Sequence, residues 1–276
     1  MSSRRLLLFV CACAIFGTLL FDGSAEGHYR LVTSSDALIR KSLRVMTYNI
    51  HVGVGMDKKL DLQRIADVIS AERPDLVGLQ EVDRGVERTE GKDEIAELAK
   101  LASMHYAFAH NLDYQGGQYG VAILSRFAIQ KLDHRKYENR REAERRGMLR
   151  VETQIDGRIF NFVTTHLDYQ HADGRLFETE QMLKFLEGIG GPLIVVGDFN
   201  DEPAGEAYKL ILTKFYDSWL KAGARGPGLS YPADKPVKRI DYVFTRQSDP
   251  IRAKKAWIVS TLASDHLPLV TDLEIR

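Results

Sequence analysis

The most constraining stretch of the chain is Leu193-Ile194-Val195-Val196, an unbroken apolar run followed by Gly197-Asp198-Phe199-Asn200. Four apolar residues, three of them β-branched, predict a strand that is buried on both faces. If the backbone stays extended beyond it, the side chains of Asp198 and Asn200 point the same way. A carboxylate and an amide at the end of a buried strand are costly unless they have partners. The alternative is a simple turn, because Asp, Asn and Gly are common turn formers.

Polar side chains also stand at the ends of other expected strands. They are Asn49, Glu81 and His166 at the ends of three strands, and Asp241, Asp265 and His266 at the starts of two more. In a mixed sheet, the start of one strand and the end of its antiparallel neighbour lie on the same edge, so these groups could converge on one rim. Histidines, carboxylates and amides together suit a hard divalent cation and acid–base chemistry, and the lack of cysteine among them argues against zinc–thiolate binding.

Strand and helix signals alternate along the chain after about residue 42. Periodic apolar positions predict helices over 61–71, 95–102 and 176–186. Strand-like runs cover residues 43–50, 76–80, 120–124, 127–132, 149–155, 159–165, 193–196, 240–245, 256–259 and 267–275. No internal repeat or change in composition divides residues 42–276, so we expect one domain of mixed, partly antiparallel sheets covered by helices.

Composition sets outer limits on function. The 276 residues are 44% hydrophobic, which is enough for a sizeable core. The formal net charge is zero and the pI is near 7.1. The chain therefore exerts no global electrostatic pull toward nucleic acid or an anionic membrane.

Residues 1–25 have the layout of a secretory signal. A basic pair, Arg4-Arg5, precedes the apolar run 6–21, and small residues precede a possible cleavage after Ala25. The run is short for a membrane span, and an uncleaved membrane tether through residues 6–21 is the alternative. Residues 26–41 lack periodicity and are expected to form a linker. We therefore expect export to the periplasm or cell envelope, with no disulfide, because both cysteines lie in the apolar run.

Six short motifs occur in order along residues 42–276. They are Thr47-Tyr48-Asn49-Ile50, Leu79-Gln80-Glu81-Val82, Thr165-His166-Leu167, Gly197-Asp198-Phe199-Asn200, Arg239-Ile240-Asp241-Tyr242 and Ser264-Asp265-His266. Together they resemble the endonuclease/exonuclease/phosphatase superfamily, which includes deoxyribonuclease I, neutral sphingomyelinases and inositol-polyphosphate phosphatases. The resemblance implies an α/β (α+β) fold, a four-layer sandwich in which two mixed β-sheets pack face to face with helices outside. It also implies hydrolysis of a phosphate ester with Mg²⁺ or Mn²⁺.

The resemblance also implies roles for the residues of the metal and the attacking water. Glu81 would be the main metal ligand, with Asn49 beside it, and Asp265 would contribute to the metal side of the pocket. Asp198 would orient and deprotonate the attacking water, and Asn200 would help to hold that water or a phosphate oxygen.

The remaining motif residues would bind the phosphate. His266 would stabilise developing charge on a phosphoryl oxygen, with Asp241 fixing its orientation and favouring its protonated form. His166 would face the same phosphate from another side, and Arg146 stands where related enzymes place a phosphate-binding arginine. Alternatives remain open: Asp241 could pair with Arg239, His166 could be a buried core histidine, and the arginine-rich segment 134–147 could be a solvated loop.

These features predict an exported, metal-dependent phosphodiesterase that acts as a monomer. A phospholipid or small phosphodiester is favoured over nucleic acid, because the chain is neutral and begins with a membrane-directed segment. A nuclease is the alternative, supported by the basic region 135–150. A non-catalytic phosphate- or lipid-binding module is a third possibility, although such a module would tolerate the loss of some motif residues. The Gly- and Tyr-rich segment 111–120 could form a pocket wall or a flexible hairpin.

Overall fold

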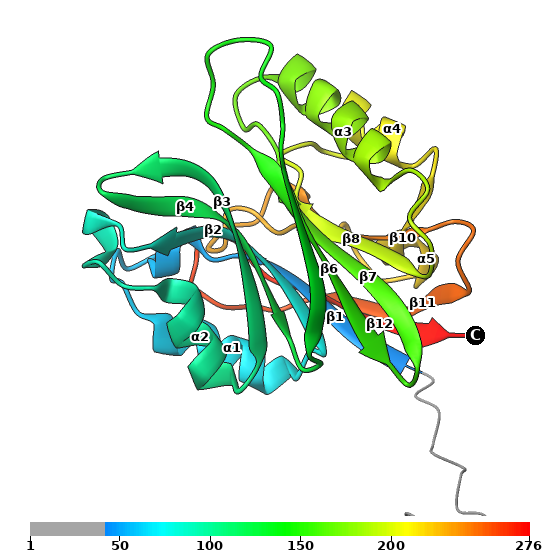
Figure 1. Ribbon diagram of the computed structural model, residues 1–276, viewed down its shortest axis with the longest axis horizontal. Coiled ribbons are helices and arrows are strands. Elements are labelled where there is room, and N and C mark those ends of the chain that lie inside the picture. Colours follow the sequence, from blue (N-terminus) through cyan, green and yellow to red (C-terminus); the bar gives the residue numbers. More distant parts are fainter. Residues whose placement is uncertain (1–41) are drawn as a thin grey trace, which may run out of the picture. The chain divides into compact units, whose positions relative to one another are not determined.

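Twelve strands form two six-stranded mixed sheets in the computed structural model, which describes residues 42–276 (Figure 1). The first sheet contains β1 (Ser42–Asn49), β2 (Leu76–Arg84), β3 (His105–Tyr114), β4 (Gly117–Ser125), β11 (Ile251–Ile258) and β12 (Leu269–Ile275), in the order β11-β12-β1-β2-β4-β3. The second contains β5 (Ile129–Lys136), β6 (Gly147–Ile155), β7 (Arg158–His166), β8 (Leu193–Asp198), β9 (Phe215–Asp217) and β10 (Asp241–Arg246), in the order β5-β6-β7-β8-β10-β9. The expected secretory signal 1–25, the alternative membrane tether 6–21 and the expected linker 26–41 lie outside the described residues.

Helices cover the outer face of each sheet. Figure 1 shows α1 (Leu62–Glu72) and α2 (Glu94–Ala102) beside the first sheet, and α3 (Ala172–Leu186) and α4 (Glu206–Ile211) beside the second. The short helix α5 (Ser218–Lys221) and two 3₁₀ turns, His51–Gly53 and Glu87–Thr89, complete the helical elements of the described part. Aspartates begin α1 and α2, since the Asp61 and Asp93 side chains accept hydrogen bonds from the first-turn backbone N–H groups of Arg64 and Ala96.

Three apolar clusters fill the interfaces between the layers. The first lies between the sheets and joins, among others, Val45 and Leu76 of the first sheet to Phe162 and Val196 of the second. The second packs the first sheet against α1 and α2, and the third packs the second sheet against α3 and α4. Strand β8 is buried along its whole length because it takes part in both the first and the third cluster. This arrangement confirms the predicted sandwich of two mixed sheets with helices outside.

Some elements differ from the sequence-based expectation. Strand β3 was not predicted, and the segment 111–120 forms the tip of a β3–β4 hairpin that turns at Gln115 and Gly116. The strand expected over 127–132 lies further along, at β5. In the part of the chain that the structure describes, no helix is long and apolar enough to cross a membrane.

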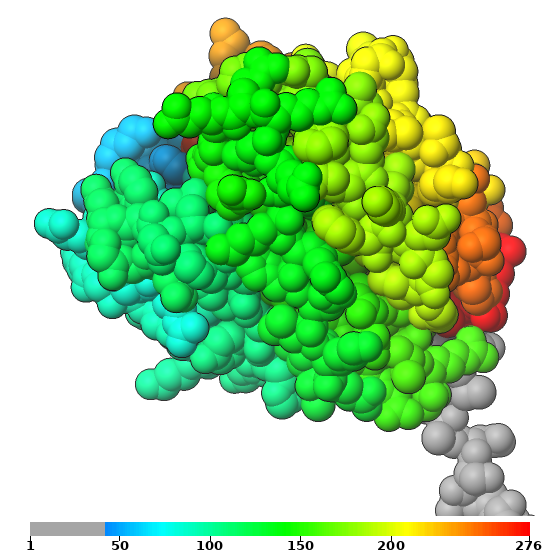
Figure 2. All heavy atoms as spheres, turned by 45° about the horizontal axis from the view of Figure 1, so that its top comes forward, coloured from blue at the N-terminus to red at the C-terminus, as the bar shows by residue number. Residues whose placement is uncertain are grey.

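Figure 2 shows the face on which the segments from β3 to β7, coloured green, lie between the first helices and the later yellow segments. The connection between β5 and β6, residues 137–146, forms a loop that rises beyond the strand ends next to α3 (Figure 1). This loop and the β3–β4 hairpin stand beside the rim at which the central strands of both sheets end.

Candidate active site

The central parallel strands of both sheets end at one rim, where they present polar side chains. β1 ends at Asn49 and β8 ends at Asp198, while His166 ends β7 directly opposite Asp198 in the strand register. Glu81 lies in β2 where the pairing with β4 shifts between Leu79 and Val82, and its φ is +56°. A bulge of this kind re-aims a side chain, and it brings Glu81 to the rim.

The turn after β8 places Asn200 differently from the expected extended backbone. Asn200 has a φ of +49°, in the left-handed region that Asn tolerates, and its backbone N–H donates to Asp198 Oδ1 over 2.9 Å. Asn200 therefore reaches the rim through an Asx-type turn: the condition of an extended backbone is not met, and the turn that the sequence left as the alternative is present, although Asp198 and Asn200 still line one cavity. The Asn200 amide lies 3.0 Å from His166 Nε2, and its nitrogen donates to the Leu167 carbonyl over 3.1 Å.

Asn49 joins the two sheets across the rim. Its amide nitrogen donates to Glu81 Oε1 over 2.9 Å and to Asp198 Oδ2 over 3.0 Å. Its oxygen accepts the His51 backbone N–H over 3.1 Å. Asn49 is fully buried, so it lies beneath the pocket surface and orients one carboxylate from each sheet.

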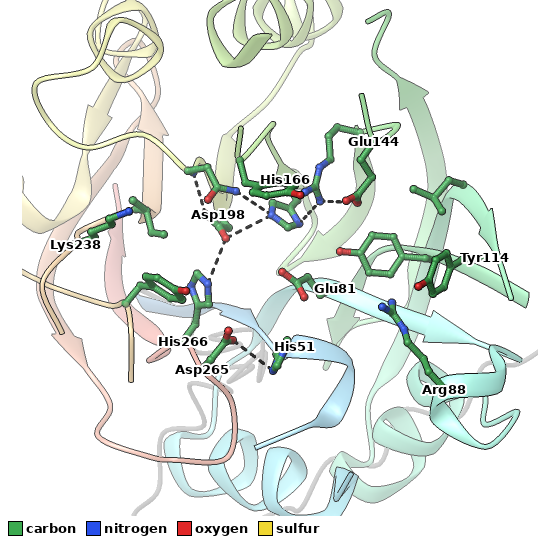
Figure 3. Close-up of a pocket in the computed structure, with 17 residues that line it drawn as sticks. His51, Glu81, Arg88, Tyr114, Glu144, His166, Asp198, Lys238, Asp265 and His266 are labelled. Carbon is green, nitrogen blue, oxygen red and sulfur yellow. Dashed lines mark hydrogen bonds and ion pairs between the residues drawn. The ribbon is translucent and has the colours of Figure 1, made fainter. Parts of the chain in front are cut away.

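His266 forms a buried ion pair with Asp241. Its Nδ1 lies 2.9 Å from Asp241 Oδ2, and its Nε2 lies 3.6 Å from Asp198 Oδ2 (Figure 3). Burial alone would lower the pKa of His266, but the Asp241 and Asp198 carboxylates outweigh burial and raise the pKa to about 10. The imidazole is therefore a cation at neutral pH. The alternative pairing of Asp241 with Arg239 does not occur, because Arg239 contacts Asp217 instead.

His166 faces Asp198 from the opposite side and is neutral. Its Nε2 lies 3.5 Å from Asp198 Oδ2, and Arg146 Nη1 donates to its Nδ1 over 2.7 Å. Burial holds the pKa of His166 well below its ordinary value, and the neighbouring Arg146 and His266 charges lower it further. His166 is thus buried, as the alternative reading of the sequence allowed, but it also lies at the rim.

Asp198 lies between the two imidazoles and is almost fully buried. Burial and the charge of Asp241 raise the pKa of Asp198 to about 7, despite the opposing effects of His266 and of the hydrogen bonds from Asn200 and Asn49. A carboxylate with such a pKa can accept a proton near neutral pH.

A divalent cation has suitable ligands on the first-sheet side of the rim. The carboxylates of Glu81 and Asp265 line the same cavity, and oxygen donors of this type suit Mg²⁺. His51 Nδ1 lies 3.8 Å from Asp265 Oδ1 and 3.1 Å from the Val54 carbonyl, which places His51 at the edge of this group. Ser264 Oγ donates to the Asn49 carbonyl over 2.7 Å and so holds the loop that carries Asp265.

A second group of potential metal ligands comprises Asp198, Asp241 and His266. Their ligand atoms lie within 4.8 Å of one another, so this buried group could also hold a metal ion. However, the protonated His266 imidazole would first have to lose a proton from whichever ring nitrogen binds the ion. The donor chemistry therefore favours Glu81 and Asp265 for a hard cation and the second group for acid–base chemistry.

A cavity of about 510 Å³ opens above these residues. Seven of the nine predicted site residues line it, while Asn49 and Asp241 lie buried beneath it. The roles assigned to the nine stay predictions, but the structure brings all of them together. Further lining residues that the motifs did not indicate are Arg88, Tyr114, Tyr119, Glu144, Tyr169, Tyr231 and Lys238. Tyr114 and Tyr119 flank the hairpin turn, which therefore forms the pocket wall that the sequence left as one of two possibilities.

The fold and the rim define a phosphohydrolase of known type. The model of the endonuclease/exonuclease/phosphatase family matches residues 46–266, and the chain belongs to this family. Members of the family are hydrolases of phosphate esters and generally depend on a divalent metal.

The individual proteins to which the chain is similar share only a minority of its residues. The uncharacterized protein YbhP of Escherichia coli is 27% identical over 252 residues, which cover 85% of this chain and 97% of YbhP. A putative neutral sphingomyelinase of Caenorhabditis elegans is 27% identical over 208 residues, covering 65% of this chain and 46% of that protein. The crystal structure of a functionally unknown conserved protein from Enterococcus faecalis superposes with a TM-score of 0.73 at 20% identity, covering 85% of this chain and all of the other, and supports the fold alone.

Proposed function

We propose that the chain is a magnesium-dependent phosphodiesterase of the cell envelope, acting on a phospholipid or another small phosphodiester. The observation that carries the proposal is the position of Asp198, within 3.6 Å of both a cationic and a neutral imidazole and hydrogen-bonded through Asn49 to Glu81. A proton acceptor, phosphate-binding groups and oxygen ligands for a metal thus face one cavity.

The residues divide the work of in-line attack by water on phosphorus. Asp198 accepts the proton of the water, and Asn200 and the neutral His166 hold it in line. His266, kept protonated by Asp241, stabilises the negative charge that grows on the phosphoryl oxygens, and Arg146 adds a second cation. When bound by Glu81 and Asp265, a divalent cation supplies Lewis-acid stabilisation of the same charge.

The residues and the volume of the cavity favour a compact substrate. Four tyrosines line the cavity, and its volume suits a small organic group next to the phosphate. The similarity to a putative neutral sphingomyelinase agrees with a lipid headgroup. The arginine-rich loop supports nucleic-acid binding less than its sequence suggests. Two of its arginines, Arg140 and Arg141, already pair with Glu180 and Asp173 of α3.

The proposal is tested by hydrolysis with the full chain in detergent, with Mg²⁺, Mn²⁺ or EDTA. The substrates are sphingomyelin, phosphatidylinositol, bis-p-nitrophenyl phosphate, plasmid DNA and RNA. We expect metal-dependent turnover of a lipid or small diester that Glu81→Ala abolishes and the exposed-site control Glu97→Gln does not. Faster turnover of DNA or RNA would replace the proposal by a nuclease. Binding without turnover on any ester would indicate a non-catalytic binding module.

A further inference from the structure

The loop between β5 and β6 directs one carboxylate into the active-site cavity. Its ends are joined by the backbone bond from Tyr137 N–H to the Arg146 carbonyl over 2.9 Å, and Tyr137 is fully buried. Arg145 Nη1 donates to the Tyr137 carbonyl over 3.0 Å. These contacts fix the backbone on both sides of Glu144, whose side chain lines the cavity. Figure 3 shows Glu144 on the same side as Tyr114, with His166 between it and Asp198.

Glu144 is the counter-charge of the arginine at the back of the cavity. Its Oε1 lies 3.0 Å from Arg146 Nη1, the same nitrogen that donates to His166. Only 4% of the Arg146 side chain and 33% of the Glu144 side chain are exposed, so water screens this pair weakly. Neither Glu144 Oε1 nor Arg146 Nε has a hydrogen-bond partner of good geometry among the described residues, although both atoms are buried. The pair is therefore close but incompletely satisfied, and it faces the site of the reaction.

Other cations that line the cavity also carry their own carboxylate. Arg88 binds both oxygens of Asp83 over 2.7 and 2.9 Å, and His266 binds Asp241. Among the basic side chains that line the cavity in the described part, Lys238 alone shows no ion pair, and it is exposed at the opposite side of the cavity from Glu144 (Figure 3). The protein thus provides little uncompensated positive charge near Arg146 for a second negative charge on the substrate.

A phosphate monoester and a phosphodiester differ in the charge that this cavity meets. Above the second ionisation of phosphate the monoester is a dianion, whereas a diester is a monoanion. An additional charge beside the half-buried carboxylate of Glu144 is repelled at short range and low dielectric constant. We propose that Glu144 is a specificity residue that makes this site prefer phosphodiester monoanions over phosphate monoester dianions.

This inference rests on the proposed function, and its test separates the two. The full chain with Mg²⁺ is assayed at pH 8 on p-nitrophenyl phosphate and methyl p-nitrophenyl phosphate, which share a leaving group and differ in charge. We expect Glu144→Gln to raise the monoester-to-diester ratio of kcat/KM about tenfold. The matched control is Glu142→Gln, a carboxylate of the same loop that is exposed and does not line the cavity; it should leave the ratio unchanged.

A binding measurement keeps the inference testable without turnover. Calorimetry of the magnesium-loaded protein gives Kd for phenyl phosphate and for methyl phenyl phosphate, and Glu144→Gln should tighten only the dianion, about tenfold. If the wild-type chain hydrolyses neither ester and none of the substrates of the earlier panel, the proposed function fails while the calorimetry still decides the role of Glu144. An unchanged ratio with unchanged Kd values would overturn the inference. An equal gain for both esters would also overturn it, because Glu144 would then only obstruct the pocket.

Discussion

The two sheets share a strand order but bring different chemistry to the rim. In each, a central strand has an antiparallel neighbour on one side and a parallel neighbour on the other: β2 lies between β4 and β1, and β7 lies between β6 and β8. The parallel neighbour then pairs with an antiparallel strand, β12 or β10. The parallel strands β1 and β8 end at Asn49 and Asp198, and the central strands carry Glu81 and His166.

The matched positions extend behind the rim. Two residues beyond Glu81, the backbone N–H of Asp83 donates to Glu94 of α2 over 2.7 Å. Two residues beyond His166, the backbone N–H of Asp168 donates to Glu178 of α3, also over 2.7 Å. The supporting framework is therefore nearly repeated, while the first sheet presents the carboxylate of Glu81 and the second presents Asp198 between two imidazoles. The two halves differ in a few side chains and in the bulge at Glu81, which β7 lacks.

The largest expected effect is at Asp198. Asp198→Asn removes the proton acceptor but keeps the size of the side chain, and we expect kcat to fall about 10³- to 10⁴-fold with little change in the Mg²⁺ concentration required for half-maximal activity. Steady-state kinetics over a Mg²⁺ titration measures both. The double variant Asn49→Asp/Asp198→Asn sharpens the comparison: recovery of activity would mean that the matched positions of the two sheets are interchangeable, which we do not expect.

Substitution of Glu81 should weaken Mg²⁺ binding, in contrast to substitution of Asp198, which should lower kcat. Glu81→Gln removes the charge from the first-sheet side, and we expect roughly a hundredfold loss of activity, most of which returns at high Mg²⁺ concentration. Calorimetric titration of Mg²⁺ should show a weaker site, while Asp198→Asn should bind Mg²⁺ nearly as the wild type does. Equal weakening of Mg²⁺ binding in both variants would place the metal between the sheets and would contradict the division of roles.

Contact between the sheets is tested at Gly78 of β2. A Cβ at this position would lie under 3.0 Å from Val196 and Thr164 of the second sheet. Gly78→Ala should therefore lower the free energy of unfolding by about 1–3 kcal/mol, measured by urea denaturation. Gly190→Ala is the matched control, because a Cβ there meets no atom within 4 Å. Equal stability of the two variants would mean that the sheets separate easily at this point.

The smallest effect concerns the two buried glutamates behind the rim. Burial raises the pKa of Glu94 to about 8 and that of Glu178 to about 7, so each is preferentially protonated in the folded chain. The folded state then binds more protons than the unfolded state between about pH 4.5 and 8, and stability falls as the pH rises through this window. Glu94→Gln should reduce that slope by at most about 1.4 kcal/mol per pH unit.

The pH dependence of stability should also differ between the Glu94 and Glu178 variants. Glu94 Oε1 is buried without a hydrogen-bond partner of good geometry, which agrees with its higher pKa. We therefore expect Glu94→Gln to flatten the dependence more than Glu178→Gln does, when unfolding is measured by urea titration at half-unit steps from pH 5 to 8. The exposed Glu97→Gln serves as the control on α2. A larger effect at Glu178 would contradict the ranking.

The central strands and their terminal side chains were predictable from the sequence, for a local reason. An unbroken apolar run such as 193–196 indicates a strand buried on both faces. The polar residue that follows the run then has to lie where the strand ends, at the rim of the sheet. Strand β3 gave no such signal, because its buried positions are Ala107, Ala109 and Asn111, and Leu112 is the one large aliphatic residue in the strand. The three-residue β9 and the short α4 and α5 are also too brief for a periodic pattern.

The pocket wall depends on tertiary contacts that no short motif encodes. Arg88, Glu144 and Lys238 come from three connections, and each reaches the cavity only because its connection packs beside the rim. Glu144 and Arg146 turn into the cavity from an arginine-rich run in which Arg140 and Arg141 pair with Glu180 and Asp173 of α3. The order of residues along a loop does not indicate which of its charges turns inward, since that depends on anchors such as the buried Tyr137.

The pairing of β1 with β12 has a consequence for biosynthesis. Thr47 pairs with Leu269 and Ser42 pairs with Glu274, so the earliest strand of the described chain receives one of its two neighbours only when the latest one has been made. His266 stands directly before that strand. A nascent chain can therefore contain every strand of the second sheet and still lack both His266 and one of the two strands that flank β1.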